Sequence, residues 1–160
     1  MTNYHFEYET VVNAPIDEVF AFFCRVENLA KLTPVTLGFK VLSKLPIEMR
    51  VGTLIDCQVR IRGIPVKWRT EISVWEPGKR FIDIQVKGPY RKWIHEHRFE
   101  PDGAGTRIWD AVEYAVPGGL LAPIVHNLFV RREIKSVFAY REKVLREAWI
   151  TTNDPHLDVW

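Results

Sequence analysis

The segment from residue 90 to residue 114 constrains the fold most, because its side chains alternate between two kinds along two stretches that a turn separates. A period of two residues is the pattern of a β-strand, whose successive side chains point to opposite faces. The separating sequence, Pro101-Asp102-Gly103, is typical of a hairpin connection. We therefore predict an antiparallel hairpin formed by residues 90–99 and 106–114.

One face of this hairpin mixes apolar side chains with groups that can carry charge. Its members are Trp93, His95, His97 and Phe99 from the first strand, and Ile108, Asp110, Val112 and Tyr114 from the second. Polar groups in an apolar wall cost free energy unless they are paired. A ligand cavity behind this face would explain them. So would a closed internal network in which Asp110 holds a histidine across the strand pair and nothing binds.

The chain before this hairpin predicts one strand and two short helices, followed by more strands. Residues 5–13 alternate as a half-buried strand, and Pro15 suits the first turn of a helix. A second short helix is expected over residues 27–32, ending before Pro34.

Four further strands are predicted at residues 36–45, 53–62, 66–75 and 81–87, with turns at Gly63-Ile64-Pro65 and Pro77-Gly78. In the third of these strands Trp75 falls on the polar outer face. In the fourth, the apolar side is Ile82, Ile84 and Val86, opposite Asp83, Gln85 and Lys87. Seven strands with short turns indicate an antiparallel meander with one apolar face.

The C-terminal part predicts one long helix. Pro117-Gly118-Gly119 ends the sheet, and residues 120–149 carry a broad apolar band along about 45 Å of helix. The triplets Arg131-Arg132-Glu133 and Arg141-Glu142-Lys143 are expected to face solvent. The helix must bury its band on the concave face of the sheet, and a curved sheet around one helix leaves a gap where ligands bind. We expect one α+β domain over residues 1–150 and a tail over residues 151–160.

Composition excludes several classes of function. A net charge of +2 gives no reason to expect nucleic acid as a partner, and no apolar run approaches the ~18 residues of a membrane span. The two cysteines, Cys24 and Cys57, form no paired metal or redox motif and read as buried apolar residues. Residues 1–7 show no secretory pattern. We expect a cytoplasmic protein that does not insert stably into membranes.

Several local signatures resemble the SRPBCC superfamily, the START/Bet v 1-like group of helix-grip proteins. They are residues 12–20 (VNAPIDEVF), 93–99 (WIHEHRF), 105–107 (GTR), 110–114 (DAVEY) and 117–119 (PGG). The last four are similar to its polyketide cyclase/dehydrase-like ligand-binding branch. The resemblance implies a seven-stranded, curved antiparallel sheet around a long C-terminal helix, with two short helices after the first strand.

The resemblance implies a carrier or chaperone that binds a small hydrophobic ligand, such as a lipid, an isoprenoid, a quinone or a polyketide-like molecule. We expect the cavity between sheet and helix to hold it, and the candidate ligand-binding residues are Trp93, His95, His97, Phe99, Asp110, Tyr114, Trp68 and Phe22. Phe39 is a further candidate for the cavity wall. His126 fits the cavity mouth as well as it fits solvent, whereas Arg132 is expected in solvent rather than at the mouth.

Two other functions fit the same sequence. In a cyclase or dehydratase, His95 or His97 paired with Asp110 would act as acid and base, and Tyr114 would donate to a developing oxyanion. In a protein-interaction module the cavity would be collapsed, and binding would depend on outward-facing tryptophans at positions 75 and 109.

The His-x-His spacing with a carboxylate across the strand pair is also a two-histidine, one-carboxylate metal set. The resemblance is to proteins that are mostly free of metal. We therefore expect no metal and no cofactor.

Overall fold

The computed structural model describes residues 2–149 and contains a seven-stranded antiparallel sheet over that range. In chain order the strands are β1 (Tyr4–Val12), β2 (Lys40–Val41), β3 (Leu54–Ile61), β4 (Ile64–Glu76), β5 (Arg80–Lys87), β6 (Lys92–Asp102) and β7 (Gly105–Ala115). Their order across the sheet is β1-β7-β6-β5-β4-β3-β2. The predicted meander is confirmed, with β1 added beside the last strand.

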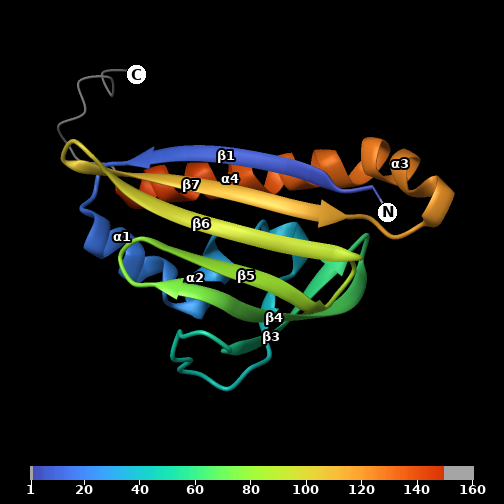
Figure 1. Ribbon diagram of the computed structural model, residues 1–160, viewed down its shortest axis with the longest axis horizontal. Helices are drawn as coiled ribbons and strands as arrows, with labels where there is room; N and C mark the ends of the chain where they lie inside the picture. The colour runs from blue at the N-terminus through green and yellow to red at the C-terminus, as the bar shows by residue number, and fades with distance from the viewer. Residues whose placement is uncertain (1, 150–160) are drawn as a thin grey trace.

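Helices follow β1 and β7. The first group is α1 (Ile16–Phe23), α2 (Val26–Lys31) and η1 (Val35–Leu37), a 3-10 helix of one turn. The second runs without a break through η2 (Gly119–Leu121), α3 (Ala122–Val125), the π-helical turn η3 (His126–Val130) and α4 (Arg131–Ala148). Figure 1 shows α4 along the sheet, with α1 and α2 toward one end and α3 at the other. This is the expected α+β helix-grip fold.

The register of the hairpin β6–β7 confirms the alternation that the sequence predicts. His97 lies opposite Asp110 and Trp93 lies opposite Tyr114. His95, His97 and Asp110 are buried, at 5%, 5% and 1% exposure. The predicted inward face is therefore the inward face of the structure.

The long helix packs on the sheet through one face. Its buried residues are Ile134, Phe138, Arg141 and Leu145, at the three- and four-residue spacing of a helix face. Phe138 packs against Phe6 of β1 and His95 of β6. Arg141 was expected in solvent and is only 7% exposed. Its position three residues after Phe138 and four before Leu145 places it on the buried stripe.

Two predicted segment boundaries are wrong. The predicted strand 36–45 is a 3-10 turn followed by the two-residue strand β2. Here Gly38 has a φ of 49°, which interrupts an extended chain. The expected turn at residues 63–65 is instead a two-residue loop of Arg62 and Gly63, with φ of 52° and 81°. Positive φ at both central residues is the form that matches the twist of a hairpin.

The prediction that Trp75 faces outward is also wrong. Ile72 pairs with Asp83 and Val74 pairs with Ile82, so an irregularity at Ser73 shifts the register of β4 against β5. An extra residue in one strand reverses the phase of the alternation beyond it. Trp75 consequently packs inward, with its ring 5.4 Å from Phe20 and 5.7 Å from Phe81, centroid to centroid.

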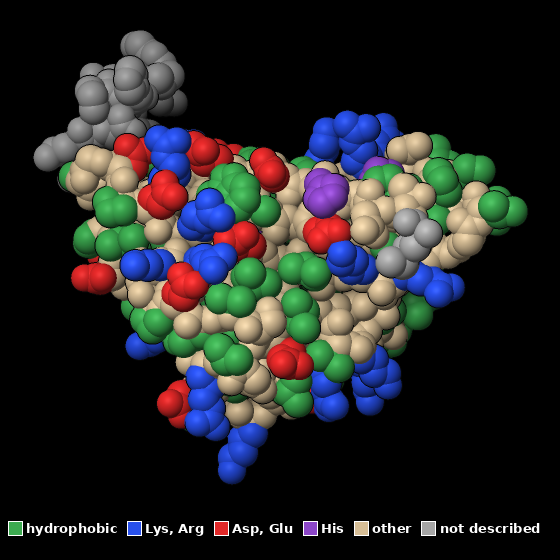
Figure 2. All heavy atoms as spheres, viewed as in Figure 1, with side chains coloured by type: hydrophobic (Ala, Val, Ile, Leu, Met, Phe, Trp, Pro, Cys, Tyr) green, Lys and Arg blue, Asp and Glu red, His purple; other side chains and the backbone are tan. Residues whose placement is uncertain are grey.

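The outer face of the sheet carries many charged side chains among scattered apolar ones. Acidic and basic side chains are interspersed over β1, β7 and β6 in Figure 2, and they form cross-strand ion pairs such as Lys92–Glu113 and Arg107–Glu9. Apolar side chains gather at the α3 end, where the exposed ones are Leu120, Leu121, Ile124, Leu128 and Phe129. Within residues 2–149 no helix is long and apolar enough to cross a membrane. The predicted tail 151–160 lies outside the described residues.

Candidate functional site

A cavity of about 450 Å³ lies between the sheet and the helices. Most of its wall is aliphatic or aromatic, drawn from α1, α2, β3, β4 and the C-terminal helices. Among its lining residues are Phe22, Phe23, Leu29, Leu32, Phe39, Ile55, Cys57, Val59, Trp68, Ile72, Trp93, Phe129, Ile134, Val137 and Phe138. A volume of this size suits a small organic molecule. A cavity of this size also disagrees with the alternative of a protein-interaction module whose cavity is collapsed.

Five of the eight sequence-predicted ligand residues line this cavity: Trp68, Phe22, Trp93, His95 and His97. Trp68 and Trp93 meet edge to face, with ring centroids 5.3 Å apart, and form a rigid aromatic wall.

Phe99, Asp110 and Tyr114 do not line the cavity. Phe99 fills the core, with its ring centroid 5.2 Å from that of Phe20 and 5.1 Å from that of Phe23. Asp110 lies behind the histidines. The Tyr114 hydroxyl is 2.9 Å from His126 Nε2, so it is engaged away from the cavity.

The remaining candidates divide in the same way. Phe39 lines the cavity, whereas His126 is only 6% exposed and stacks on Tyr4 at a centroid distance of 3.5 Å. Arg132 is exposed and does not line the cavity. Of the two cysteines, Cys57 is buried in the cavity wall and Cys24 is half-buried against the core.

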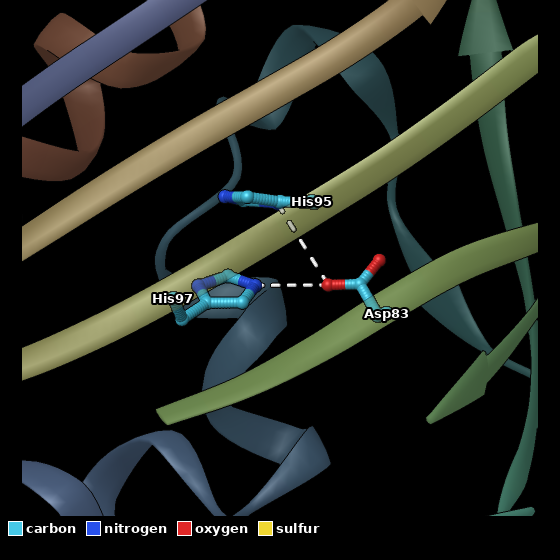
Figure 3. A group of neighbouring side chains, drawn as sticks. All are labelled: Asp83, His95 and His97. Carbon is cyan, nitrogen blue, oxygen red and sulfur yellow. Dashed lines mark hydrogen bonds and ion pairs between the residues drawn. The ribbon is translucent and has the colours of Figure 1, made fainter. Parts of the chain in front are cut away.

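The polar end of the cavity holds two histidines between two carboxylates. On one side Asp110 Oδ1 lies 2.8 Å from His95 Nε2 and 3.0 Å from His97 Nδ1. On the other side Asp83 Oδ2 lies 2.8 Å from His97 Nε2 and 3.8 Å from His95 Nδ1. Both imidazoles reach from β6 toward Asp83 on β5, as Figure 3 shows. The two rings lie 3.7 Å apart, centroid to centroid.

The sequence analysis missed Asp83. The apolar alternation of Ile82, Ile84 and Val86 suggested that Asp83 faced solvent, but those apolar side chains lie on the outer face. The available signal in the sequence was Phe81, a large aromatic residue two positions before Asp83 and therefore on the same strand face. In the structure Phe81 is 5% exposed. Since β5 borders a cavity at this point, its inner face does not have to be apolar.

Arg141 joins this cluster from α4. Its Nη1 atom is 3.5 Å from Asp110 Oδ1, and its guanidinium carbon is 4.9 Å from the centre of the Phe138 ring. Arg141 lines the cavity, and its Nε and Nη1 atoms have no hydrogen-bond partner among the described residues. An unpaired buried donor is costly, so a ligand acceptor at this place would be stabilised.

The electrostatics of the cluster set its protonation. Burial alone raises the pKa of a carboxyl and lowers that of an imidazole. The hydrogen bond from His95 and the close contact with His97 outweigh burial at Asp110 and hold its pKa below the usual range. The pKa of Asp83 is lowered against burial by its hydrogen bond with His97 and by the charges of His95 and Arg141.

The two histidines shift in opposite directions. Burial and the neighbouring His97 lower the pKa of His95. At His97 the contacts with Asp110 and Asp83 overcome burial and raise the pKa. The arrangement favours two ionised carboxylates with one imidazolium and one neutral imidazole between them. It can therefore donate and accept protons at the cavity wall.

Comparisons with known proteins agree with this architecture. Residues 12–140 match the family described as polyketide cyclase / dehydrase and lipid transport. The protein TTHA0849 from Thermus thermophilus is 20% identical, with a TM-score of 0.65 over 91% of this chain and 99% of that chain. The Zhui aromatase/cyclase from Streptomyces sp. R1128 is 16% identical, with a TM-score of 0.65 over 92% and 96% of the two chains.

The major latex-like protein 151 of Panax ginseng is 10% identical, with a TM-score of 0.68 over 93% of this chain and 99% of that chain. At these identities the similarity shows the fold alone. No curated protein matches the sequence. The family match spans most of the chain and agrees with the observed sheet and helix. The chain therefore belongs to the polyketide cyclase/dehydrase and lipid transport family of the SRPBCC superfamily.

Proposed function

We propose that this protein binds a small hydrophobic ligand in the cavity between the sheet and α4, and acts as its carrier or chaperone. The observation that carries the proposal is the cavity of about 450 Å³, with a mostly apolar wall and a cluster of ionisable groups at one end. Burial of apolar ligand surface supplies about 25 cal/mol per Å². The polar end, formed by Asp83, His95, His97 and Arg141, would orient one oxygen-bearing group of a lipid, isoprenoid, quinone or polyketide-like molecule.

The α3 end gives the ligand a route to the cavity. Phe129 lines the cavity and is also 43% exposed, so wall and surface meet at this residue. The guanidinium carbon of Arg62, at the tip of the β3–β4 hairpin, lies 3.8 Å from the centre of the Phe129 ring. Separation of this contact would widen the opening without unfolding either element.

The test is identification of the retained molecule and its displacement by a filled cavity. Native mass spectrometry of the purified protein, followed by extraction and small-molecule mass spectrometry, should find one apolar molecule per chain. Val59→Phe fills the cavity wall and should reduce its retention, whereas Val86→Phe places the same ring on the exposed side of β5 and should not. Equal retention by both variants would contradict binding in the cavity, and an empty wild-type protein would contradict a tight carrier.

A second candidate is acid–base catalysis of a cyclisation or dehydration. It is favoured by one observation, that both histidines line the cavity while each lies 2.8 Å from a carboxylate oxygen. Such pairs supply a base and an acid within reach of a bound substrate. The Tyr114 hydroxyl is engaged by His126, so the oxyanion donor would have to be Arg141 rather than Tyr114.

This candidate predicts turnover as well as binding. A retained molecule, incubated with fresh protein, should lose the mass of water or change its retention time without a change of mass. His95→Asn should abolish that conversion and leave the fold intact by circular dichroism. Binding without conversion in the wild-type protein would exclude catalysis on that molecule and leave the carrier function.

A further inference from the structure

We propose that Asp83, His95 and His97 form a binding site for one divalent transition-metal ion, such as Zn²⁺ or Fe²⁺, at the polar end of the cavity. Two imidazoles and one carboxylate with an open side form a ligand set that such ions use in proteins. One ligand atom from each residue lies within 4.8 Å of the other two. The resemblance of the sequence to largely metal-free proteins gave no reason to expect this site.

The distances between ligand atoms fit a metal. Asp83 Oδ2 is 2.8 Å from His97 Nε2 and 3.8 Å from His95 Nδ1. With metal–ligand bonds of about 2.1 Å, neighbouring ligand atoms lie about 3.0 to 3.4 Å apart. The two observed distances lie on either side of that range, so a shift of a few tenths of an ångström would bring both pairs into it; the third pair, between the two histidines, lies within 4.8 Å. The three side chains already point toward one another in Figure 3.

Asp110 supplies the support that metal-binding histidines need. A histidine ligand usually donates its second ring nitrogen to a carboxylate, which fixes the tautomer and the ring orientation. Asp110 Oδ1 lies 2.8 Å from His95 Nε2 and 3.0 Å from His97 Nδ1, the nitrogens that face away from Asp83. His95 Nε2 already forms a hydrogen bond with Asp110, which leaves His95 Nδ1 facing Asp83. His97 Nδ1 lies within reach of Asp110 without a hydrogen bond, so metal binding at His97 Nε2 would require that bond to form.

Two carboxylates and access from the cavity also favour a cation. Asp83 and Asp110 bring two negative charges, which Arg141 and one imidazolium balance. A metal ion bound between His97 Nε2 and Asp83 Oδ2 would take the place of the imidazolium proton. All three proposed ligands line the cavity, so the remaining coordination positions face its interior.

The experiment is zinc binding to the full-length, untagged protein after treatment with a chelator. Isothermal titration with ZnCl₂ should give one Zn²⁺ per chain, and MgCl₂ should give no binding, because imidazole ligands favour the transition metals. Asp83→Asn should weaken the zinc affinity roughly 100-fold, and Asp110→Asn roughly 10- to 100-fold through loss of orientation. His5→Ala, which removes an exposed histidine on β1, should bind zinc like the wild type.

A spectroscopic measurement keeps the proposal testable if a variant fails to fold. Co²⁺ added to the wild-type protein should give visible d–d absorption, and X-ray absorption should report two imidazoles and one carboxylate. The proposal would be overturned by wild-type protein that takes up neither ion, by a Co²⁺ shell without two imidazoles, or by Asp83→Asn protein that binds zinc like the wild type. Because no organic ligand is needed, metal binding and ligand binding can fail separately.

Discussion

Arg141 Nη1 lies 3.5 Å from Asp110 Oδ1, and this contact joins helix α4 to strand β7 in the interior of the molecule. We expect Arg141→Met to lower the free energy of unfolding by about 1 to 3 kcal/mol. The methionine keeps an apolar contact with Phe138 but leaves the Asp110 carboxylate with only the histidines. Urea denaturation followed by circular dichroism measures the change.

The control for this pair is Arg146→Met on the same helix. Arg146 is exposed and pairs with Glu142 one turn away, an arrangement that contributes little in water. Its free energy of unfolding should stay within about 0.5 kcal/mol of the wild-type value. Equal losses in the two variants would contradict a specific role for the buried ion pair.

Trp75 should be a stability residue rather than a surface contact. Its ring packs against Phe20 and Phe81, so Trp75→Ala should lower the free energy of unfolding by about 2 to 4 kcal/mol. Trp109→Ala is the comparison, because Trp109 lies on the outer face under Arg98 and should cost about 1 kcal/mol. The same urea titration ranks the two variants. A larger loss of unfolding free energy for Trp109→Ala would contradict the inward packing of Trp75.

Both cysteines should be unreactive in the folded protein at neutral pH. Burial raises the pKa of the Cys24 thiol to about 11, and burial together with Asp83 and Asp56 raises that of Cys57 to about 12. The reactive thiolate is therefore scarce. Ellman's reagent should report two thiols only after unfolding in guanidinium, and fast labelling of the native protein would contradict this.

The raised pKa values of the two thiols also make the free energy of unfolding depend on pH. Unfolded thiols lose their protons near pH 9, while the folded thiols hold theirs. The unfolded state is therefore stabilised relative to the folded state as pH rises above 9. We expect the free energy of unfolding to fall between pH 9 and pH 11 by less in Cys57→Ala than in the wild type. Parallel curves for the two proteins would show that Cys57 does not contribute.

Arg62 should control the rate at which the cavity exchanges its contents. Removal of its cation–π contact with Phe129 in Arg62→Ala should speed release of a fluorescent apolar probe by about two- to fivefold, since such contacts contribute about 0.5 to 1 kcal/mol. Stopped-flow displacement measures the rate. Arg60→Ala, on the exposed side of β3, should release the probe at the wild-type rate, and the same acceleration in both variants would point to a general charge effect.

The β6–β7 hairpin could be predicted from the sequence because aromatic and aliphatic residues mark its inner face at every second position. That phase placed His95, His97 and Asp110 inside correctly. The same rule failed one strand away, because Ile82 and Ile84 lie on the outer face while Asp83 borders the cavity. The alternation of polar and apolar residues predicts the buried face of a strand that packs on a filled core. A strand that borders a cavity does not have to show this alternation.

Arg141 and Trp75 were misplaced for different reasons. Arg141 stands in a charged triplet, which suggested solvent, although its spacing from Phe138 and Leu145 puts it on the buried stripe. Trp75 follows an irregularity at Ser73 that has no clear mark in the sequence. The position of Arg141 depends on a buried carboxylate elsewhere in the chain, and the phase of β4 depends on its pairing with β5. Neither partner can be read from the local sequence.

The pairing of β1 with β7 brings Tyr4 beside Tyr114 and Val12 beside Thr106. During synthesis from the N-terminus, β1 must wait for more than ninety residues before its partner leaves the ribosome. Contacts of such long range are slow to form because loop closure is opposed by chain entropy. Throughout that interval β1 has no strand partner, so a nascent chain that stalls before β7 is a natural substrate for chaperones that hold unpaired strands.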